Sequence, residues 1–125
     1  MYFTRSQMHL FTPSRNKYTA FRCCSFSPFE RQFTIWKEVD VIIGMHGAGL
    51  TNAAFARRGG AIIELKGNYG YPDRAYHTVA DSRVGRHVQI DMRSTMNRAK
   101  FLYVMTPQVI LRILNALSRL QSGTD

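Results

Sequence analysis

Hydrophobic and polar residues recur along the chain with two different periods, and from residue 27 onward each period occupies its own segments. Apolar residues three or four positions apart predict an amphipathic helix over about 27–38. The Ser-Pro-x-Glu pattern that begins at Ser27 is typical of a capping box and predicts the start of this helix. A last helix is expected from Thr106 to near Gly123, with its apolar stripe at Ile110, Ile113, Leu114, Leu117 and Leu120.

Strands are predicted where apolar residues run without a helical period. Val39–Ile43 and Ala61–Leu65 are short and rich in β-branched residues, as expected for strands covered on both faces. Residues 88–92 alternate apolar with polar side chains, which favours a strand nearer the edge of a sheet. Two more helices, over 50–57 and about 73–84, fall between these strands.

Helices and strands therefore alternate along the chain, which predicts an α/β fold with a Rossmann-like, doubly wound parallel sheet. We expect this domain to span residues 27–122 and to be followed by a polar tail at 123–125. The N-terminal segment 1–26 is poorly assigned, with two short strands expected at Met8–Phe11 and Tyr18–Cys24. Residues 93–104 form a connector without a clear pattern.

The net charge and the number of cysteines and histidines indicate which partners and cofactors to expect. The 125 residues carry a formal net charge of +9, which leaves open a basic module that binds nucleic acid. Because the basic residues are scattered singly, we regard nucleic acid as an unlikely partner. No stretch resembles a targeting signal or a membrane span. The two cysteines are adjacent and the histidines lack metal-ligand spacing, so no metal or cofactor is expected.

A glycine-bearing loop, Gly44 to Asn52, lies between a predicted strand and a predicted helix. This arrangement binds phosphates in α/β sheets because unpaired backbone N–H groups lie at the positive end of the helix dipole. His46 and Thr51 add side chains that can hydrogen-bond a phosphoryl oxygen. The loop departs from the dinucleotide fingerprint, and a glycine turn that merely lets helix and strand pack remains the alternative.

The residues from Asp40 to Asn52, which read DVIIGMHGAGLTN, together with AIIEL at 61–65, resemble the signature of glycosyltransferase family 61. The upstream SF and FERQ segments, at 25–26 and 29–32, are similar to the helix that precedes the strand in that family. The resemblance spans about residues 25–92, whereas residues 1–24 match the family poorly. It implies the C-terminal, donor-binding half of a GT-B-like glycosyltransferase.

The resemblance implies donor binding at His46, Gly47, Ala48, Gly49, Leu50, Thr51 and Glu64. The backbone amides of 47–50 are expected at the donor diphosphate, with His46 and Thr51 hydrogen-bonding its oxygens. Glu64 is expected to accept ribose hydroxyl protons; a strand-end carboxylate bonded to nearby backbone is the alternative.

The reaction that the resemblance implies is inverting transfer of a sugar from a UDP-sugar to a hydroxyl of a protein or glycan. The sugar is expected to be N-acetylglucosamine or a pentose, and the donor is expected to bind without a metal. The resemblance also implies a partner, the missing N-terminal half of the enzyme, which supplies the catalytic base. Its members imply an address in the endoplasmic reticulum or Golgi lumen.

Some other polar residues near the predicted site have simpler interpretations. Arg57 and Arg58 lie at a predicted helix C-terminus, where cations are favoured, and are interpreted as structural. Tyr69 and Tyr71 could stack on a nucleobase, although packing roles are commoner for such residues. His87 is expected at the surface or partly buried, without a catalytic role.

Overall fold

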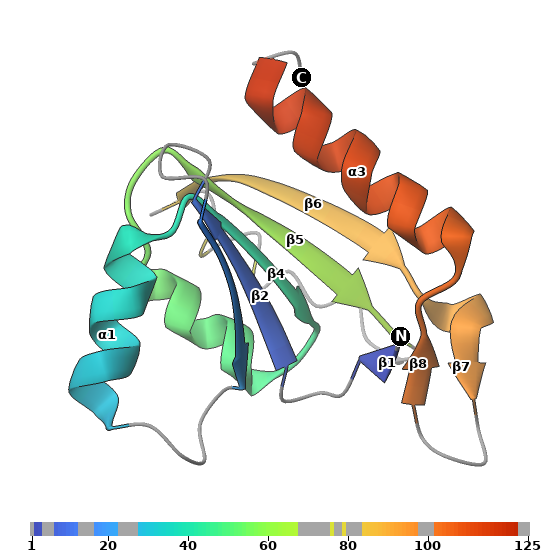
Figure 1. Cartoon of the computed structure of the whole chain (residues 1–125), viewed down its shortest axis with the longest axis horizontal. Helices are drawn as coiled ribbons and strands as arrows, with labels where there is room; N and C mark the ends of the chain where they lie inside the picture. The colour runs from blue at the N-terminus through green and yellow to red at the C-terminus, as the bar shows by residue number, and fades with distance from the viewer. Residues whose placement is uncertain are drawn as a thin grey trace.

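The computed structural model describes residues 2–3, 7–12, 17–22, 28–67, 76, 79, 84–97 and 102–122. These residues form an α/β fold around a five-stranded sheet of order β3-β2-β4-β5-β6 (Figure 1). The strands span Lys17–Arg22 (β3), Gln7–Thr12 (β2), Val41–Met45 (β4), Gly60–Lys66 (β5) and Gly85–Asp91 (β6).

The sheet is parallel, as predicted, over β4, β5 and β6, and β6 lies at its edge. The two strands expected near the N-terminus are confirmed as β2 and β3. They form an antiparallel hairpin, and β2 also pairs antiparallel with β4, so the sheet is mixed. The sheet therefore continues across the boundary that the sequence suggested at residue 27.

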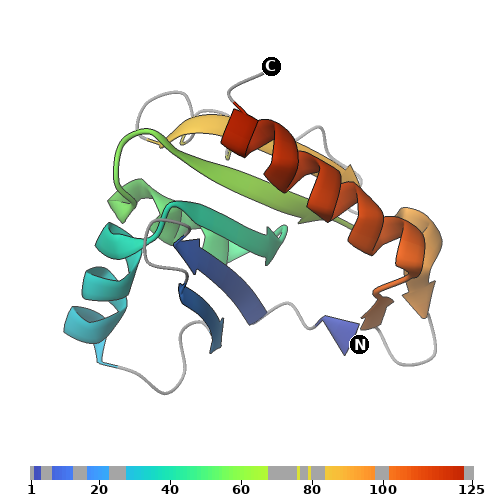
Figure 2. The same cartoon turned by 45° about the horizontal axis from the view of Figure 1, so that its top comes forward.

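Helices cover both faces of this sheet (Figures 1 and 2). The helix α1 (Phe29–Glu38) and the 3₁₀ helix η2 (Ala48–Phe55) cover one face, and α3 (Pro107–Ser122) covers the other. The α1-side cluster contains Trp36, Val39, Ile42, Leu50, Ala53, Ala56, Ile62, Tyr76 and Val84. The α3-side cluster contains Val41, Ile43, Met45, Ala61, Ile63, Leu65, Ile90, Met92, Tyr103, Met105, Val109, Ile113 and Ala116.

Alternation along β4 and β5 explains the two clusters. Successive side chains of a strand point to opposite faces, so Ile43 joins the α3-side cluster and its neighbour Ile42 joins the α1-side cluster. Because both faces of these strands are covered, their sequences are almost uninterrupted runs of apolar residues. Glu64 is the one charged side chain that is buried among the described residues.

The ends of two elements differ from the prediction. The helix α1 begins at Phe29 with Pro28 as its N-cap and no side-chain capping bond, so the capping box expected at Ser27 is wrong. Because Pro28 takes the cap position, Glu30 is the second residue of the helix and not the third, as a capping box requires. The strand expected over 39–43 is shifted to 41–45, since Val39 caps the preceding helix.

The connection from η2 to β5 depends on two glycines. Gly59 has φ +80°, a left-handed conformation that favours glycine, and it lies beyond Ala56, the C-cap of η2. A Cβ on Gly60 would lie 2.7 Å from the carbonyl oxygen of Asp40, so a side chain there would push the strands apart. Arg57 forms an ion pair with Asp40 at 2.7 Å, consistent with its structural interpretation.

The connector at 93–104, which the sequence left unassigned, contributes to a second sheet. A short 3₁₀ helix η4 (Arg93–Thr95) leads into β7 (Met96–Asn97), and β8 (Leu102–Val104) pairs with it and with β1 (Tyr2–Phe3). This antiparallel sheet lies beyond the carboxyl ends of β5 and β6 (Figure 1).

The apolar stripe predicted for the last helix is partly wrong. In α3 the buried residues are Val109, Ile113 and Ala116, whereas Ile110 and Leu114 are 42% and 55% exposed. Two overlapping stripes of the same helical spacing exist in this sequence, displaced by one position. Periodicity alone cannot choose between them, and packing of α3 against β5 and β6 selects one.

Several expectations concern residues outside the described part of the chain. They are the helix over 73–84, apart from Tyr76, Val79 and Val84, and also the adjacent cysteines, Tyr69, Tyr71 and the tail at 123–125. Within the residues that the structure describes, no helix is both long and apolar enough to span a membrane.

Candidate functional site

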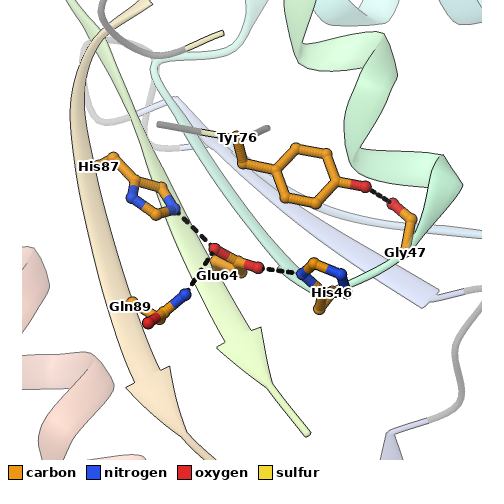
Figure 3. Close-up of polar contacts among 6 residues, drawn as sticks. All are labelled: His46, Gly47, Glu64, Tyr76, His87 and Gln89. Atoms are coloured by element: carbon orange, nitrogen blue, oxygen red, sulfur yellow. Dashed lines mark hydrogen bonds and ion pairs between the residues drawn. The ribbon is translucent and has the colours of Figure 1, made fainter. Parts of the chain in front are cut away.

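The candidate site begins where β4 ends. His46 directly follows the last residue of this strand, and its backbone N–H donates to the carbonyl of Leu65 in β5 at 2.9 Å. The edge of the His46 ring meets the ring of Tyr76, with centroids 5.2 Å apart. The Tyr76 hydroxyl donates to the carbonyl of Gly47 (Figure 3). Tyr76 therefore contacts two neighbouring residues of the loop, His46 and Gly47.

Glu64 lies beneath this loop, in β5. Strand alternation places its side chain on the same face as Ile62, where it is 0% exposed. Its Oε1 accepts a hydrogen bond from Nδ1 of His46. Its Oε2 accepts from Nε2 of His87 at 2.8 Å and from the amide of Gln89 at 3.2 Å (Figure 3). We call Glu64, His46, His87 and Gln89 the Glu64 cluster.

The neighbours of Glu64 keep it charged. Burial by itself disfavours the carboxylate and raises its pKa, but the hydrogen bonds from His87, His46 and Gln89 outweigh that effect. The pKa of Glu64 is therefore lowered from 4.5 to about 2. Because an ionised carboxylate only accepts, the facing nitrogens, Nδ1 of His46 and Nε2 of His87, must both carry hydrogen.

The sequence analysis missed His87 and Gln89 as members of the site. In the parallel pairing of β5 with β6, Ile62 is opposite His87 and Glu64 is opposite Gln89. The alternation of 88–92 assigned the polar side chains to the less buried face but did not show what covers that face. The strand register is the signal that identifies them. Once β5 and β6 pair in this register, residues 87 and 89 must lie on the same face of the sheet as Glu64.

The glycine loop is tighter than expected. The helix after it starts at Ala48 and is 3₁₀ in type, so the N–H of Leu50 donates to the carbonyl of Gly47 at 2.9 Å. The Leu50 amide, expected at the donor diphosphate, is thus engaged within the turn, and its side chain is buried in the α1-side cluster. By 3₁₀ geometry, the amides of Ala48 and Gly49 have no acceptor inside the helix.

The remaining predicted residues divide between surface and interior. The side chain of Thr51 is exposed, and that of His46 is 12% exposed. Glu64 has three side-chain donors, which neither of its two sequence-based interpretations anticipated. Ribose binding by Glu64 stays a prediction, and it requires a ribose hydroxyl to displace one of those donors.

A separate groove of about 640 Å³ lies on the other side of the sheet, between β6 and α3. Its charged lining residues, Asp91, Arg112 and Arg119, are exposed. The candidate site differs because its carboxylate is buried and hydrogen-bonded. Within the described ranges, no three His, Cys, Asp or Glu side chains gather into a metal-binding group.

The chain resembles a known protein family over part of its length. The sequence model of the glycosyltransferase 61 family matches residues 10–63, from β2 through the glycine loop to the residue before Glu64. This match confirms the resemblance deduced from the motif as far as residue 63, and its expected extension to residue 92 stays a prediction. The expectation that residues 1–24 match poorly is wrong for 10–24, the part that includes β3 and the end of β2. Searches of curated proteins and of solved structures found no significant match.

Proposed function

We propose that this chain is the donor-binding part of an enzyme that transfers a sugar from a nucleotide sugar to a hydroxyl, because residues 10–63 match the sequence model of glycosyltransferase family 61. The observation that carries the proposal is the position of the glycine loop. It follows β4 at the carboxyl ends of three parallel strands, the edge at which α/β sheets bind ligands.

The loop has the chemistry that a diphosphate needs. Ala48 and Gly49 open the 3₁₀ helix, so their amides can donate to phosphoryl oxygens. The ring of His46 lies at the start of the same loop, anchored from below by Glu64. A net charge of +9 over the whole chain further favours an anionic ligand.

In the proposed reaction the acceptor oxygen attacks the anomeric carbon as the bond from that carbon to the diphosphate oxygen breaks. The sugar is transferred with inversion, the nucleoside diphosphate leaves, and a base supplied by another part of the enzyme takes the hydroxyl proton. The chain described here stabilises the charge that develops on the leaving diphosphate. This role needs hydrogen-bond donors already in place, which is what the loop offers.

The finer assignments rest on the family resemblance. We propose a UDP-sugar donor carrying N-acetylglucosamine or a pentose, a protein or glycan acceptor, and donor binding without a metal ion. We also propose that the chain works with an acceptor-binding domain in the lumen of the endoplasmic reticulum or Golgi.

This function is tested by calorimetric titration of the full chain with UDP. The titration is run at two salt concentrations and repeated in EDTA. We expect saturable binding that Gly47→Trp weakens by at least about tenfold, because the indole fills the loop. Among the described atoms, the nearest to a Cβ on Gly47 is the Met45 carbonyl oxygen at 4.0 Å, so the variant can fold.

Leu111→Trp is the matched control, since Leu111 is an exposed residue of α3 on the other face of the sheet. It should bind UDP like the wild type. Equal binding by both variants would place the ligand elsewhere. Absence of UDP binding, together with steeply salt-dependent binding of RNA or DNA, would contradict the proposal and favour a basic nucleic-acid module.

A further inference from the structure

The groove between β6 and α3 lies along the outer edge of a strand. Among the strands that the structure describes, β6 pairs with β5 alone. The N–H of Met92 donates to the carbonyl of Lys66 at 2.7 Å, so the even-numbered residues of β6 direct their backbone groups toward β5. The backbone groups of Gln89 and Asp91 therefore point away from β5, into the groove that both residues line.

The wall of the groove is a flank of α3, which lies over β5 and β6 (Figure 2). Its polar residues are Arg112, Asn115 and Arg119, all of them exposed. Arg86 of β6 donates to the carbonyl of Leu120 at 2.6 Å, which holds the end of α3 against the strand. The apolar lining residues are Val88, Ile90, Ala116 and Leu120.

The charge of this groove is positive. Within the part of the chain that the structure describes, neither Arg112 nor Arg119 forms an ion pair. Asp91 is already bonded, because its two oxygens accept from the backbone N–H and the guanidinium of Arg93 at 2.8 Å. These bonds lower the pKa of Asp91, and the charge of Arg112 lowers it further. Both groove arginines are thus left to meet an anionic partner.

We propose that this groove docks an extended acidic segment of a partner protein, which adds a strand to the outer edge of β6. The backbone of the segment bonds to Gln89 and Asp91, and its carboxylates pair with Arg112 and Arg119. These arginines are two helical turns apart, about 10 Å along α3. Side chains on one face of a strand recur about every 7 Å, so acidic residues at alternate positions come within reach of both arginines.

Charge and backbone chemistry favour this partner over two others. Antiparallel pairing of β6 with β6 of a second copy would bring the arginine flanks of both α3 helices together, and like charges repel. A nucleic acid has the complementary charge, but its backbone carries no amide groups that could continue the β-sheet. An acidic polypeptide meets both requirements of the groove.

Calorimetry and amide hydrogen exchange on the full chain test the docking with the peptide acetyl-EVEVEVE-amide. We expect saturable binding and slower exchange at the amides of Gln89 and Asp91, which become hydrogen-bonded. The peptide acetyl-EPEPEPE-amide has the same charge but lacks N–H groups at alternate positions, so it should bind at least about tenfold more weakly. Equal binding of the two peptides would show that no strand is added and would overturn the proposal.

Arg119→Glu is the test variant, and Arg58→Glu is its matched control. Both arginines are exposed, and Arg58 does not line the groove. We expect Arg119→Glu to weaken binding of acetyl-EVEVEVE-amide at least about tenfold and Arg58→Glu to weaken it less than about twofold. Equal weakening by both variants would mean that the net charge of the chain attracts the peptide, and the groove would have no role.

Two further outcomes would assign the groove to another partner and contradict the proposal. One is a dimer of the free chain that the peptide fails to dissociate and in which the amides of Gln89 and Asp91 are already protected. The other is an oligouridylate that displaces the peptide and protects the same amides. None of these measurements involves UDP, so the docking site is tested separately from the proposed transferase function.

Discussion

At the scale of the residue, Glu64 is a charged side chain in the protein interior, where burial destabilises a charge. A buried carboxylate is stable only when its oxygens are hydrogen-bonded, and this one accepts from two histidines and a glutamine. The sequence singled out Glu64 by its position at the end of a strand. Its partners come from the loop after β4 and from β6, and no local sequence pattern connects residues so far apart along the chain.

The lowered pKa of Glu64 predicts how stability depends on acid. Its interactions stabilise the folded chain fully above the unfolded pKa of about 4.5, and this contribution is lost as pH falls toward about 2. The whole effect is on the order of 3 kcal/mol, from about 1.4 kcal/mol for each pKa unit. Urea unfolding at a series of pH values measures it.

Glu64→Gln is the control for that series, because glutamine cannot ionise. Its free energy of unfolding should be lower than that of the wild type at neutral pH and should fall less between about pH 5 and about pH 2.5. Parallel curves for the two proteins would mean that Glu64 is not ionised in the folded state.

At the scale of the element, α3 illustrates what a helical period leaves undecided. Its apolar residues form a broad surface, of which Val109, Ile113 and Ala116 touch the sheet. Leu111 and Leu114 stay exposed, at 58% and 55%. Arg86 of β6 donates to the Leu120 carbonyl at 2.6 Å, near the end of α3, where a cation is favoured by the helix dipole.

Two alanine substitutions of similar size should distinguish the faces of α3. Ile113→Ala removes buried methyl groups and should lower the free energy of unfolding by about 2–4 kcal/mol. Leu114→Ala, one residue further, should change it by less than about 0.5 kcal/mol, because the leucine is mostly exposed. Urea denaturation followed by circular dichroism gives both values, and the reverse order would mean that α3 packs by the predicted stripe.

At the scale of the whole molecule, the two hydrophobic clusters share their strands. Residues of β4 and β5 contribute to both clusters, so neither face can lose its packing without disturbing the strands that support the other. The candidate site lies on the α1 side of these strands, and its geometry depends on the same pairing of β5 with β6. We therefore expect one cooperative unit.

The single tryptophan allows a test of this cooperativity. Trp36 is buried in the α1-side cluster, whereas α3 is the longest described helix and packs on the other face. Tryptophan fluorescence and far-ultraviolet circular dichroism should report the same midpoint in urea, because two-state unfolding makes different probes coincide. A fluorescence transition at lower urea would show that the α1 side unfolds independently.

The sequence by itself determined the elements and the motif. Helical spacing located α1 and α3, runs of β-branched residues located β4 and β5, and the glycine-bearing segment after β4 identified the family that residues 10–63 match. These features depend on neighbours in the chain, through backbone preference and the period of apolar side chains.

Only the tertiary structure decided which side chains meet. The hairpin's antiparallel place beside β4, the face of α3 that packs, and the approach of His87 and Gln89 to Glu64 all depend on strand pairing and register. The 3₁₀ turn that engages the Leu50 amide likewise arises where Leu50 is buried in the α1-side cluster. Such contacts join residues distant in sequence, so their energies belong to the packed fold rather than to any local segment.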